Sequence, residues 1–173
     1  MRRLLAPTMG GLMVAAAIFI AVPSAAATGA TCAAKAGVTL KPGISLTAST
    51  GTFVSKPGGQ IACVGTVKGV NVGGQGSLTF SGKYGTSGGD TCAKGAGSGT
   101  ISASIPKVGG GTLLVKGPFT FTRVGSAVQV SGTVNGATLA GNLQFAPDAG
   151  QNCAQTVVKS ATVAGGAAIG GSS

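Results

Sequence analysis

Apolar and polar residues alternate along most of the chain after residue 28. The alternation is clear in residues 77–80, 101–105, 119–122 and 128–131. A period of two places apolar side chains on one face of an extended strand and polar side chains on the other. No run after residue 28 keeps a helical period for ten residues, and the frequent glycines would destabilise a helix. The pattern therefore predicts an all-β chain.

Turn residues divide this pattern into short strands. Asn135-Gly136 separates two alternating runs, 127–134 and 137–145, and this dipeptide suits the tight turn of a β-hairpin. Glycine-containing turns recur about every ten residues elsewhere. We expect about nine short antiparallel strands in a two-sheet sandwich, with a closed β-barrel as the alternative.

The N-terminus has the layout of a secretory signal peptide. Arg2 and Arg3 precede an apolar run over residues 9–22, and Ala25-Ala26-Ala27 matches a cleavage site. The run is shorter than the roughly 20 residues of a membrane-spanning helix. We predict a signal peptide at 1–27, a single all-β domain at 28–163 and a flexible Gly/Ala/Ser tail at 164–173. The protein would be secreted or associated with the cell envelope, without a transmembrane segment after cleavage.

Four cysteines follow the signal: Cys32, Cys63, Cys92 and Cys153. An even number in an exported chain predicts two disulfides, for which three pairings exist. We favour Cys63–Cys92, which would join neighbouring segments, and Cys32–Cys153, which would tie the ends of the domain together. The chain has no C-x-x-C motif, no histidine and two carboxylates, so we expect no metal and no cofactor.

Residues 89–100, GDTCAKGAGSGT, suggest two kinds of site. The glycines around Lys94 could cradle a phosphate beside a reactive Cys92 thiolate, or they could form a turn held by a disulfide. The spacing of a phosphate-binding loop is absent, and a strand pattern rather than a helix follows. We predict the turn with the disulfide, and we expect Asp90 to cap its own turn. Because the chain also lacks histidine for proton transfer, we expect no enzymatic activity.

The formal net charge of the full chain is +10. Lysines at turns and strand edges could serve solubility by discouraging strand-to-strand aggregation. They could instead hold the protein on anionic cell-wall polymers. The residues that we name as candidates for this contact are Lys41, Lys56, Lys68, Lys83 and Lys94. Nucleic acid is not an expected partner, since one arginine remains after the signal and the aromatic residues form no basic platform.

Three segments carry a resemblance to known proteins: residues 63–69, 89–93 and 145–153. Their turn and cysteine patterns resemble those of small exported four-cysteine all-β proteins of actinobacteria, which have no assigned activity. This resemblance implies a fold and a location and brings no catalytic residue. In composition, the chain is also similar to the enediyne-carrier apoproteins, although its cysteine spacing and length differ from theirs.

These observations predict an exported non-catalytic structural or binding protein at or near the cell envelope. The alternative is a carrier that holds an apolar small ligand within a β-sandwich or barrel. Four phenylalanines distinguish the two functions. A cavity lined by them would favour the carrier, whereas solid packing would favour the structural role; they are Phe80, Phe119, Phe121 and Phe145.

Overall fold

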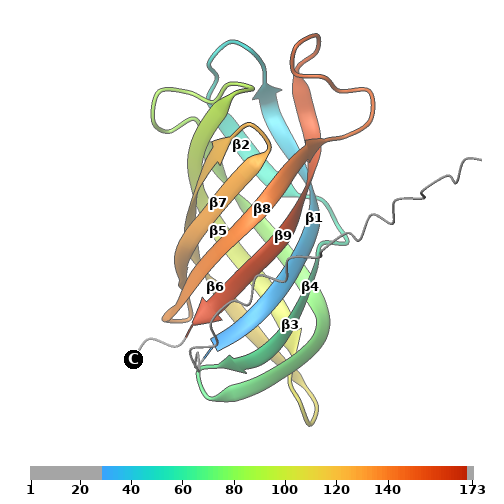
Figure 1. Cartoon of the computed structure of the whole chain (residues 1–173), viewed down its shortest axis with the longest axis vertical. Helices are drawn as coiled ribbons and strands as arrows, with labels where there is room; N and C mark the ends of the chain where they lie inside the picture. The colour runs from blue at the N-terminus through green and yellow to red at the C-terminus, as the bar shows by residue number, and fades with distance from the viewer. Residues whose placement is uncertain (1–28, 171–173) are drawn as a thin grey trace, which may run out of the picture.

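The computed structural model describes residues 29–170, and these residues form nine antiparallel strands with no helix among them (Figure 1). The strands are β1 (Gly29–Ile44), β2 (Gly51–Ser55), β3 (Gln60–Val67), β4 (Val70–Tyr84), β5 (Lys94–Pro106), β6 (Thr112–Val124), β7 (Ala127–Val134), β8 (Ala137–Pro147) and β9 (Val158–Gly170). The all-β class and the number of strands agree with the sequence pattern.

The strands belong to one sheet that closes into a ring. Neighbouring strands pair in the order β3 to β9, and β9 then pairs with β1. Strands β2 and β3 share one place in this ring, because each pairs with β1 on one side and with β4 on the other. The expected sandwich of two sheets is therefore not what forms. A sheet whose first and last strands pair has no free edge, and its buried face turns inward.

Strand β6 shows how the alternation builds the ring. Phe119 and Arg123 are buried and Phe121 is half-buried, while the intervening Thr120 and Thr122 are exposed. On this part of β6 the inward side chains are mainly apolar, and the outward ones are threonines. Burial of apolar surface, worth roughly 25 cal/mol per Å², is the main stabilisation that this arrangement gains.

The Asn-Gly hairpin is confirmed. It joins β7 to β8, and both turn residues have positive φ, 48° at Asn135 and 78° at Gly136. The Asn135 side chain also holds the neighbouring strand: its Nδ2 donates to the carbonyl of Leu114 at 2.7 Å, and its Oδ1 accepts from the amide of Lys116 at 3.1 Å. The turn therefore fixes the register of β7 against β8 and anchors this hairpin to β6.

The ring has two different ends. The β3–β4, β5–β6 and β7–β8 hairpins lie at the lower end in Figure 1, and the longer β1–β2, β4–β5 and β8–β9 connections lie at the upper end. Aliphatic side chains at the lower end are almost fully buried, with exposed fractions of 0–2%. Among them are Val67, Val72, Ile105, Val134 and Ala137.

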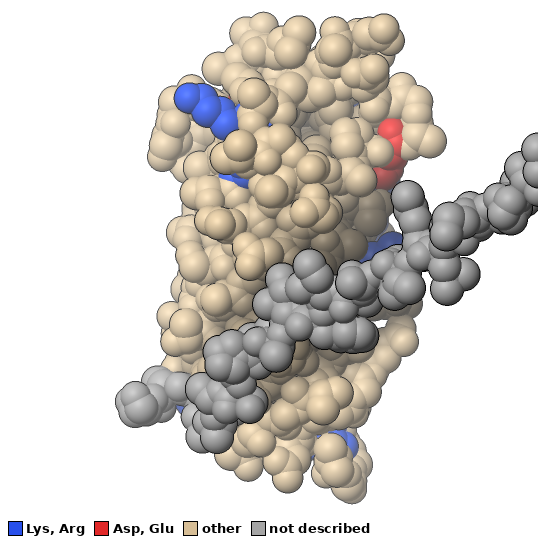
Figure 2. Space-filling view, viewed as in Figure 1, with Lys and Arg blue, Asp and Glu red and all other residues tan. Residues whose placement is uncertain are grey.

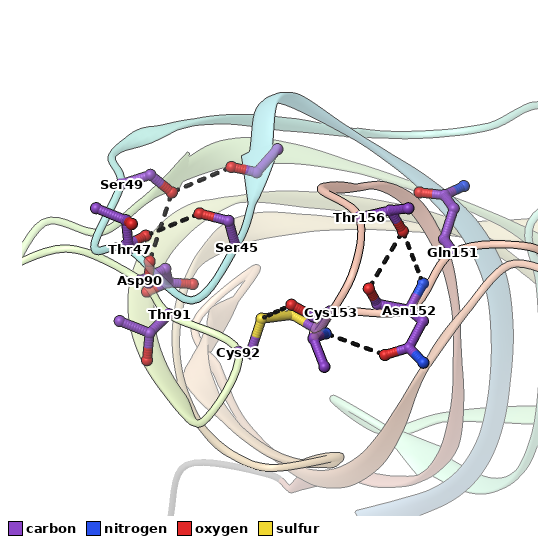
Figure 3. Close-up of a disulfide and its surroundings, with 12 residues drawn as sticks. Ser45, Thr47, Ser49, Asp90, Thr91, Cys92, Gln151, Asn152, Cys153 and Thr156 are labelled. Atoms are coloured by element: carbon purple, nitrogen blue, oxygen red, sulfur yellow. Dashed lines mark hydrogen bonds between the residues drawn. A yellow bond between two sulfur atoms is a disulfide. The ribbon is translucent and has the colours of Figure 1, made fainter.

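The structure corrects the expected disulfide pairing. Cys32 is bonded to Cys63 and Cys92 to Cys153, with Cα–Cα distances of 4.0 Å and 5.7 Å. Cys32 and Cys63 stand directly opposite each other in the register of β1 and β3. Cys92 and Cys153 lie on the β4–β5 and β8–β9 connections, which both reach the upper end of the ring (Figure 3). Closure of the sheet, rather than order along the chain, decides which cysteines meet.

Residues 164–170, which we expected in a flexible tail, form the end of a strand. This segment belongs to β9 and pairs with β8 on one side and β1 on the other. Backbone hydrogen bonds hold it on both sides, so the lack of large side chains does not prevent a strand. The predicted signal peptide (1–27) and the last three residues of the tail lie outside the described residues.

Residues 29–170 include no helix with the length and apolar character needed to cross a membrane.

Candidate ligand-binding cavity

The ring encloses a cavity of about 130 Å³. Its lining is mainly aliphatic and aromatic, and it includes all four phenylalanines that distinguish a carrier from a solid core: Phe80, Phe119, Phe121 and Phe145. These residues come from three strands, β4, β6 and β8, so the rings approach the cavity from different parts of the wall. The sequence therefore identified residues that the fold brings to one internal space.

A fifth phenylalanine, Phe53 on β2, joins this group and was missed by the sequence analysis. It is 5% exposed, and its ring centroid lies 6.1 Å from Phe80, 6.1 Å from Phe119 and 5.6 Å from Phe121. Phe80 and Phe119 are 6.5 Å apart in an edge-to-face arrangement. Such distances are typical of favourable aromatic pairs. The phenyl rings pack against one another and also form part of the cavity wall.

Glycines on the inner face of β5 make room for these groups. Gly95, Gly97 and Gly99 alternate with exposed or partly buried residues and leave the upper part of this strand without inward side chains. A Cβ atom on Gly97 would lie 2.6 Å from Cε1 of Phe121, and one on Gly95 would collide with the carboxyl group of Asp90. The glycine-rich segment that we predicted as a turn is thus mostly strand, and its alternate glycines let Asp90 and Phe121 lie close to the backbone of β5.

Asp90 is one of two buried charged residues in the described range, with an exposed fraction of 1%. Its backbone pairs with Ser49 through two hydrogen bonds, of 2.7 Å and 2.9 Å, and Figure 3 shows these two residues side by side. Its Oδ1 accepts a hydrogen bond of 2.8 Å from the amide of Ala96 in β5. The expected cap of its own turn is therefore replaced by a bond to the next strand, made inside the ring.

Arg123 is the other buried charged residue and is 4% exposed. Its Nη1 donates to the carbonyls of Cys92 at 3.0 Å and Gly125 at 2.8 Å, and its Nη2 donates to the carbonyl of Thr91. The guanidinium carbon lies 5.2 Å from the centroid of the Phe145 ring, within the range of a cation–π contact. Arg123 thereby holds the β4–β5 connection against the upper end of the cavity.

Asp90 and Arg123 both line the cavity and influence each other without direct contact. Burial raises the pKa of the Asp90 carboxyl, more than the Ala96 amide, the charge of Arg123 and the Gly85 amide lower it. Burial lowers the pKa of Arg123, against the effect of Asp90. Within residues 29–170 the pair does not come within the 4.0 Å of an ion pair. The cavity therefore has a polar end with one acidic and one basic group.

Each of these two side chains keeps one buried polar atom free. Oδ2 of Asp90 and Nε of Arg123 have no hydrogen-bond partner among the described residues. The nearby Tyr84 hydroxyl, in contrast, is fully engaged with β1: it accepts from the amide of Gly43 at 3.0 Å and donates to the carbonyl of Gly43 at 3.2 Å. Burial raises the pKa of Tyr84, so this hydroxyl stays protonated. The polar end thus offers one acceptor and one donor.

The Cys92–Cys153 disulfide fixes the connections that cover this end. Figure 3 shows it between the loops that follow β4 and β8. Cys92 immediately follows Thr91, whose carbonyl accepts from Arg123, and it comes two residues after Asp90. The crosslink therefore limits the movement of the loop that carries Asp90. As the sequence analysis expected, Cys92 is in a disulfide at this segment.

The five candidate lysines are not brought together. Lys41, Lys83 and Lys94 belong to the upper halves of β1, β4 and β5, whereas Lys68 is in the β3–β4 turn at the lower end, where its Nζ donates to the carbonyl of Asn135 at 2.7 Å. Lys56 forms an ion pair of 2.6 Å with Asp148. On the face seen in Figure 2, basic side chains lie at separate places. These positions define no single basic patch.

Asp148, the second carboxylate, lies outside the cavity. Its pKa is held below the usual value, first by the hydrogen bond from Lys56 and then by that from Ser160. In the part of the chain that the structure describes, no group of three or more His, Cys, Asp or Glu side chains could hold a metal ion.

Alternation along the strands contained a signal for two of the missed residues. Arg123 shares its parity with Phe119 and Phe121, and Tyr84 shares its parity with Phe80, so both were due to point inward with these rings. Asp90 lies in a connection, where no periodicity indicates the direction of a side chain. Its place inside the ring could be found only from the fold.

Known proteins offer no further guide to this cavity. No protein-family model matches the chain, and no curated protein or solved structure matches it. The resemblance to small exported actinobacterial proteins stays a prediction.

Proposed function

We propose that the protein is an exported, non-catalytic carrier that holds a small apolar ligand inside the ring. The observation that supports this proposal is the cavity of about 130 Å³ with Phe80, Phe119, Phe121 and Phe145 in its lining. In the sequence analysis, a cavity lined by these phenylalanines was the feature that would favour a carrier over a solid structural core. Apolar lining with a few polar groups at one place is typical of small-molecule sites.

The volume indicates the size of the ligand. An engineered cavity of about 150 Å³ lined by Leu, Ile and Phe stays dry and binds benzene. A cavity of about 130 Å³ therefore suits a compound with one six-membered ring, or an aliphatic compound of similar volume. A larger ligand would need displacement of the phenyl rings that pack around Phe53.

Adhesion to anionic wall polymers through the lysines stays a prediction. The residues named for it are distributed over both ends of the ring, and one of them is engaged by Asp148. The carrier proposal is compatible with a protein at the cell envelope, and it does not depend on these lysines.

Titration of the purified protein with toluene tests the proposal. Tyr84, the single tyrosine of a chain without tryptophan, lines the cavity, so its fluorescence reports on ligand entry, and calorimetry gives the stoichiometry. We expect saturable binding of one toluene per chain. The absence of saturable binding to the folded protein would contradict the proposal.

A matched pair of variants assigns the binding to the cavity. Ala103 is buried and lines the cavity, so Ala103→Leu places a larger side chain in the ligand's space. Ala62 is exposed on β3, so Ala62→Leu adds the same atoms on the outside. We expect Ala103→Leu to weaken toluene binding at least tenfold and Ala62→Leu to leave it unchanged. Equal binding by both variants would place the site elsewhere.

A further inference from the structure

The polar end of the cavity holds two buried atoms that remain unpaired within residues 29–170. Oδ2 of Asp90 is an acceptor, and Nε of Arg123 is a donor. Both side chains are more than nine-tenths buried and both line the cavity. Because buried polar atoms in native proteins almost always have hydrogen-bond partners, a pair of free ones beside an internal space indicates a group that binds there.

The surrounding protein groups are already engaged. Oδ1 of Asp90 is bonded to Ala96, both Nη atoms of Arg123 are bonded to backbone carbonyls, and the Tyr84 hydroxyl is bonded to Gly43. Rearranging any of them toward the free atoms would break an existing bond. A partner for Oδ2 and Nε therefore has to enter from the cavity.

We infer that the ligand of the proposed carrier has one neutral hydroxyl group, which donates to Oδ2 of Asp90 and accepts from Nε of Arg123. Its apolar body then lies among the phenylalanines. A hydroxyl is matched to this site because one oxygen both donates and accepts. The inference rests on the proposed function, and it narrows the ligand class from apolar compounds to small alcohols, including phenols.

Charge balance excludes ionic head groups. One negative and one positive side chain already offset each other at this end of the cavity. A ligand carboxylate or ammonium would bring a third charge into an apolar interior, where an uncompensated ion is strongly disfavoured. A neutral group satisfies both free atoms without changing the net charge.

The protein holds the two atoms in position before a ligand arrives. Gly95 has no side chain, so the Asp90 carboxyl can lie directly against the backbone of β5. Two bonds from Arg123, to the carbonyls of Cys92 and Thr91, and the Cys92–Cys153 disulfide restrain the connection that carries Asp90. Such support from neighbouring groups is what keeps binding atoms in a fixed geometry.

Four ligands with the same ring test the inference on the unmodified protein: toluene, benzyl alcohol, benzoate and benzylammonium. We expect benzyl alcohol to bind at least as tightly as toluene and both ions to bind at least about tenfold more weakly than the alcohol. In a cavity without a polar site, an unpaired buried hydroxyl would weaken binding by roughly fivefold or more. The comparison needs no variant, so it does not depend on whether a substitution folds.

Variants then locate the hydroxyl. Asp90→Asn keeps an oxygen for the Ala96 amide but offers an amide N–H in place of the free acceptor. We expect this substitution to weaken the binding of benzyl alcohol roughly tenfold and to change toluene binding by less than about threefold. Asp148→Asn, which alters the carboxylate outside the cavity, is the matched control and should leave both affinities unchanged. The double variant Asp90→Leu/Arg123→Met, with apolar groups of similar volume, should bind toluene and discriminate against benzyl alcohol.

The outcomes separate the two proposals. If neither toluene nor benzyl alcohol binds, the carrier function itself is wrong. If toluene binds and benzyl alcohol binds at least about fivefold more weakly than toluene, the carrier stands and the hydroxyl site is overturned, with the polar end occupied by water alone. If Asp90→Asn weakens the binding of toluene and of benzyl alcohol equally, Asp90 maintains the shape of the cavity and does not bind a hydroxyl. That result also overturns the inference.

Discussion

The two ends of the ring interior are built from the same strands and differ in nearly every physical respect. At the lower end, aliphatic side chains such as Ile105 and Val72 are at most 1% exposed and do not line the cavity. At the upper end, β5 presents glycines, β6 presents Arg123, and the β4–β5 connection inserts Asp90. The inner face of β5 therefore changes along its length, from the side chains of Ala103 and Ile105 to glycines that Asp90 and Phe121 approach closely.

If the protein is the carrier that we propose, this difference separates its stability from its ligand binding. Dense aliphatic packing yields most of the free energy of folding, whereas a cavity and buried charges lower it. Because the aliphatic packing and the buried charges lie at opposite ends, the stability gained at the lower end offsets the free-energy cost of the upper end. We therefore expect substitutions at the lower end to affect the free energy of unfolding and those at the upper end to affect ligands more.

The two disulfides differ in the same way. Cys32–Cys63 joins opposed residues of paired strands, and Cys92–Cys153 joins two connections that form no ladder with each other in the described residues. The first crosslink reinforces an existing ladder. The second crosslink, Cys92–Cys153, joins segments where such a ladder is absent.

Removal of the crosslinks gives the largest expected effect. The sequence separations are 61 for Cys92–Cys153 and 31 for Cys32–Cys63, so loss of either costs about 4 kcal/mol by the chain-entropy relation, slightly more for the longer loop. Urea unfolding of Cys92→Ala/Cys153→Ala and of Cys32→Ala/Cys63→Ala measures these costs. Hydrogen exchange should show faster opening of residues 85–93 only in the first variant. Equal local protection in both would remove the distinction between the crosslinks.

Two isoleucines on the inner face of β5 give the next effect. Ile105 is 0% exposed at the lower end, whereas Ile101 is half-buried and lines the cavity. We expect Ile105→Ala to cost about 3–4 kcal/mol and Ile101→Ala about 1–2 kcal/mol, because fewer packed atoms surround the second site. Thermal and urea unfolding measure both. A larger cost at Ile101 would show that the upper end is packed as tightly as the lower end.

Substitution of Gly95 is expected to displace the Asp90 carboxyl from its position against β5. The added methyl group of Gly95→Ala would collide with the carboxyl, so we expect a loss of about 1–3 kcal/mol. Gly166→Ala in β9 meets no atom within 4 Å and should change the unfolding free energy by less than about 0.5 kcal/mol. Denaturation of the two variants under the same conditions checks this. Similar stability would mean that the carboxyl has free space beside it.

The pH dependence should have opposite signs for the two carboxylates and is the smallest effect. The folded state raises the pKa of Asp90, so this group lowers stability as pH rises above its usual value near 3.8. The folded state lowers the pKa of Asp148, so this group adds stability above that value and loses it as pH falls below it. We expect Asp90→Asn to gain stability relative to the unmodified protein as pH rises above about 4.

Unfolding by urea between pH 2 and pH 7 measures this difference. Asp148→Asn should lose stability relative to the unmodified protein as pH rises from about 2 to about 4. Parallel curves for the two variants would contradict the assignment of one carboxylate to the interior and one to the surface.

The strands of this fold could be predicted, but the closure of the sheet could not. Alternation in residues 101–105 and 119–122 and the Asn-Gly turn identified β5, β6 and the β7–β8 hairpin. Strand β9 ends in alanines and glycines, which have little strand propensity and low complexity, and it forms because backbone partners lie on both sides. Such pairing depends on the rest of the sheet and leaves no local mark in the sequence.

The candidate site was predicted in part for a similar reason. Alternation placed the four phenylalanines on inward faces of their strands, but it left open whether they line a cavity or pack solidly. The disulfide partners were missed because Cys32 and Cys63 meet through the register of β1 and β3. Asp90 was missed because a loop residue acquires its surroundings only when distant strands assemble around it.

The pairing of β1 with β9 has a consequence for folding. Gly29 and Gly170, at opposite ends of the described chain, are partners in this ladder. Closure of the ring through this ladder joins the most distant segments of the described chain, and topologies dominated by such long-range pairings fold in milliseconds to seconds. Until it occurs, β1 and β9 are open edges that a second chain could join. A circular permutant that connects these neighbouring ends and opens the β5–β6 turn would make the closing contact local and should fold faster.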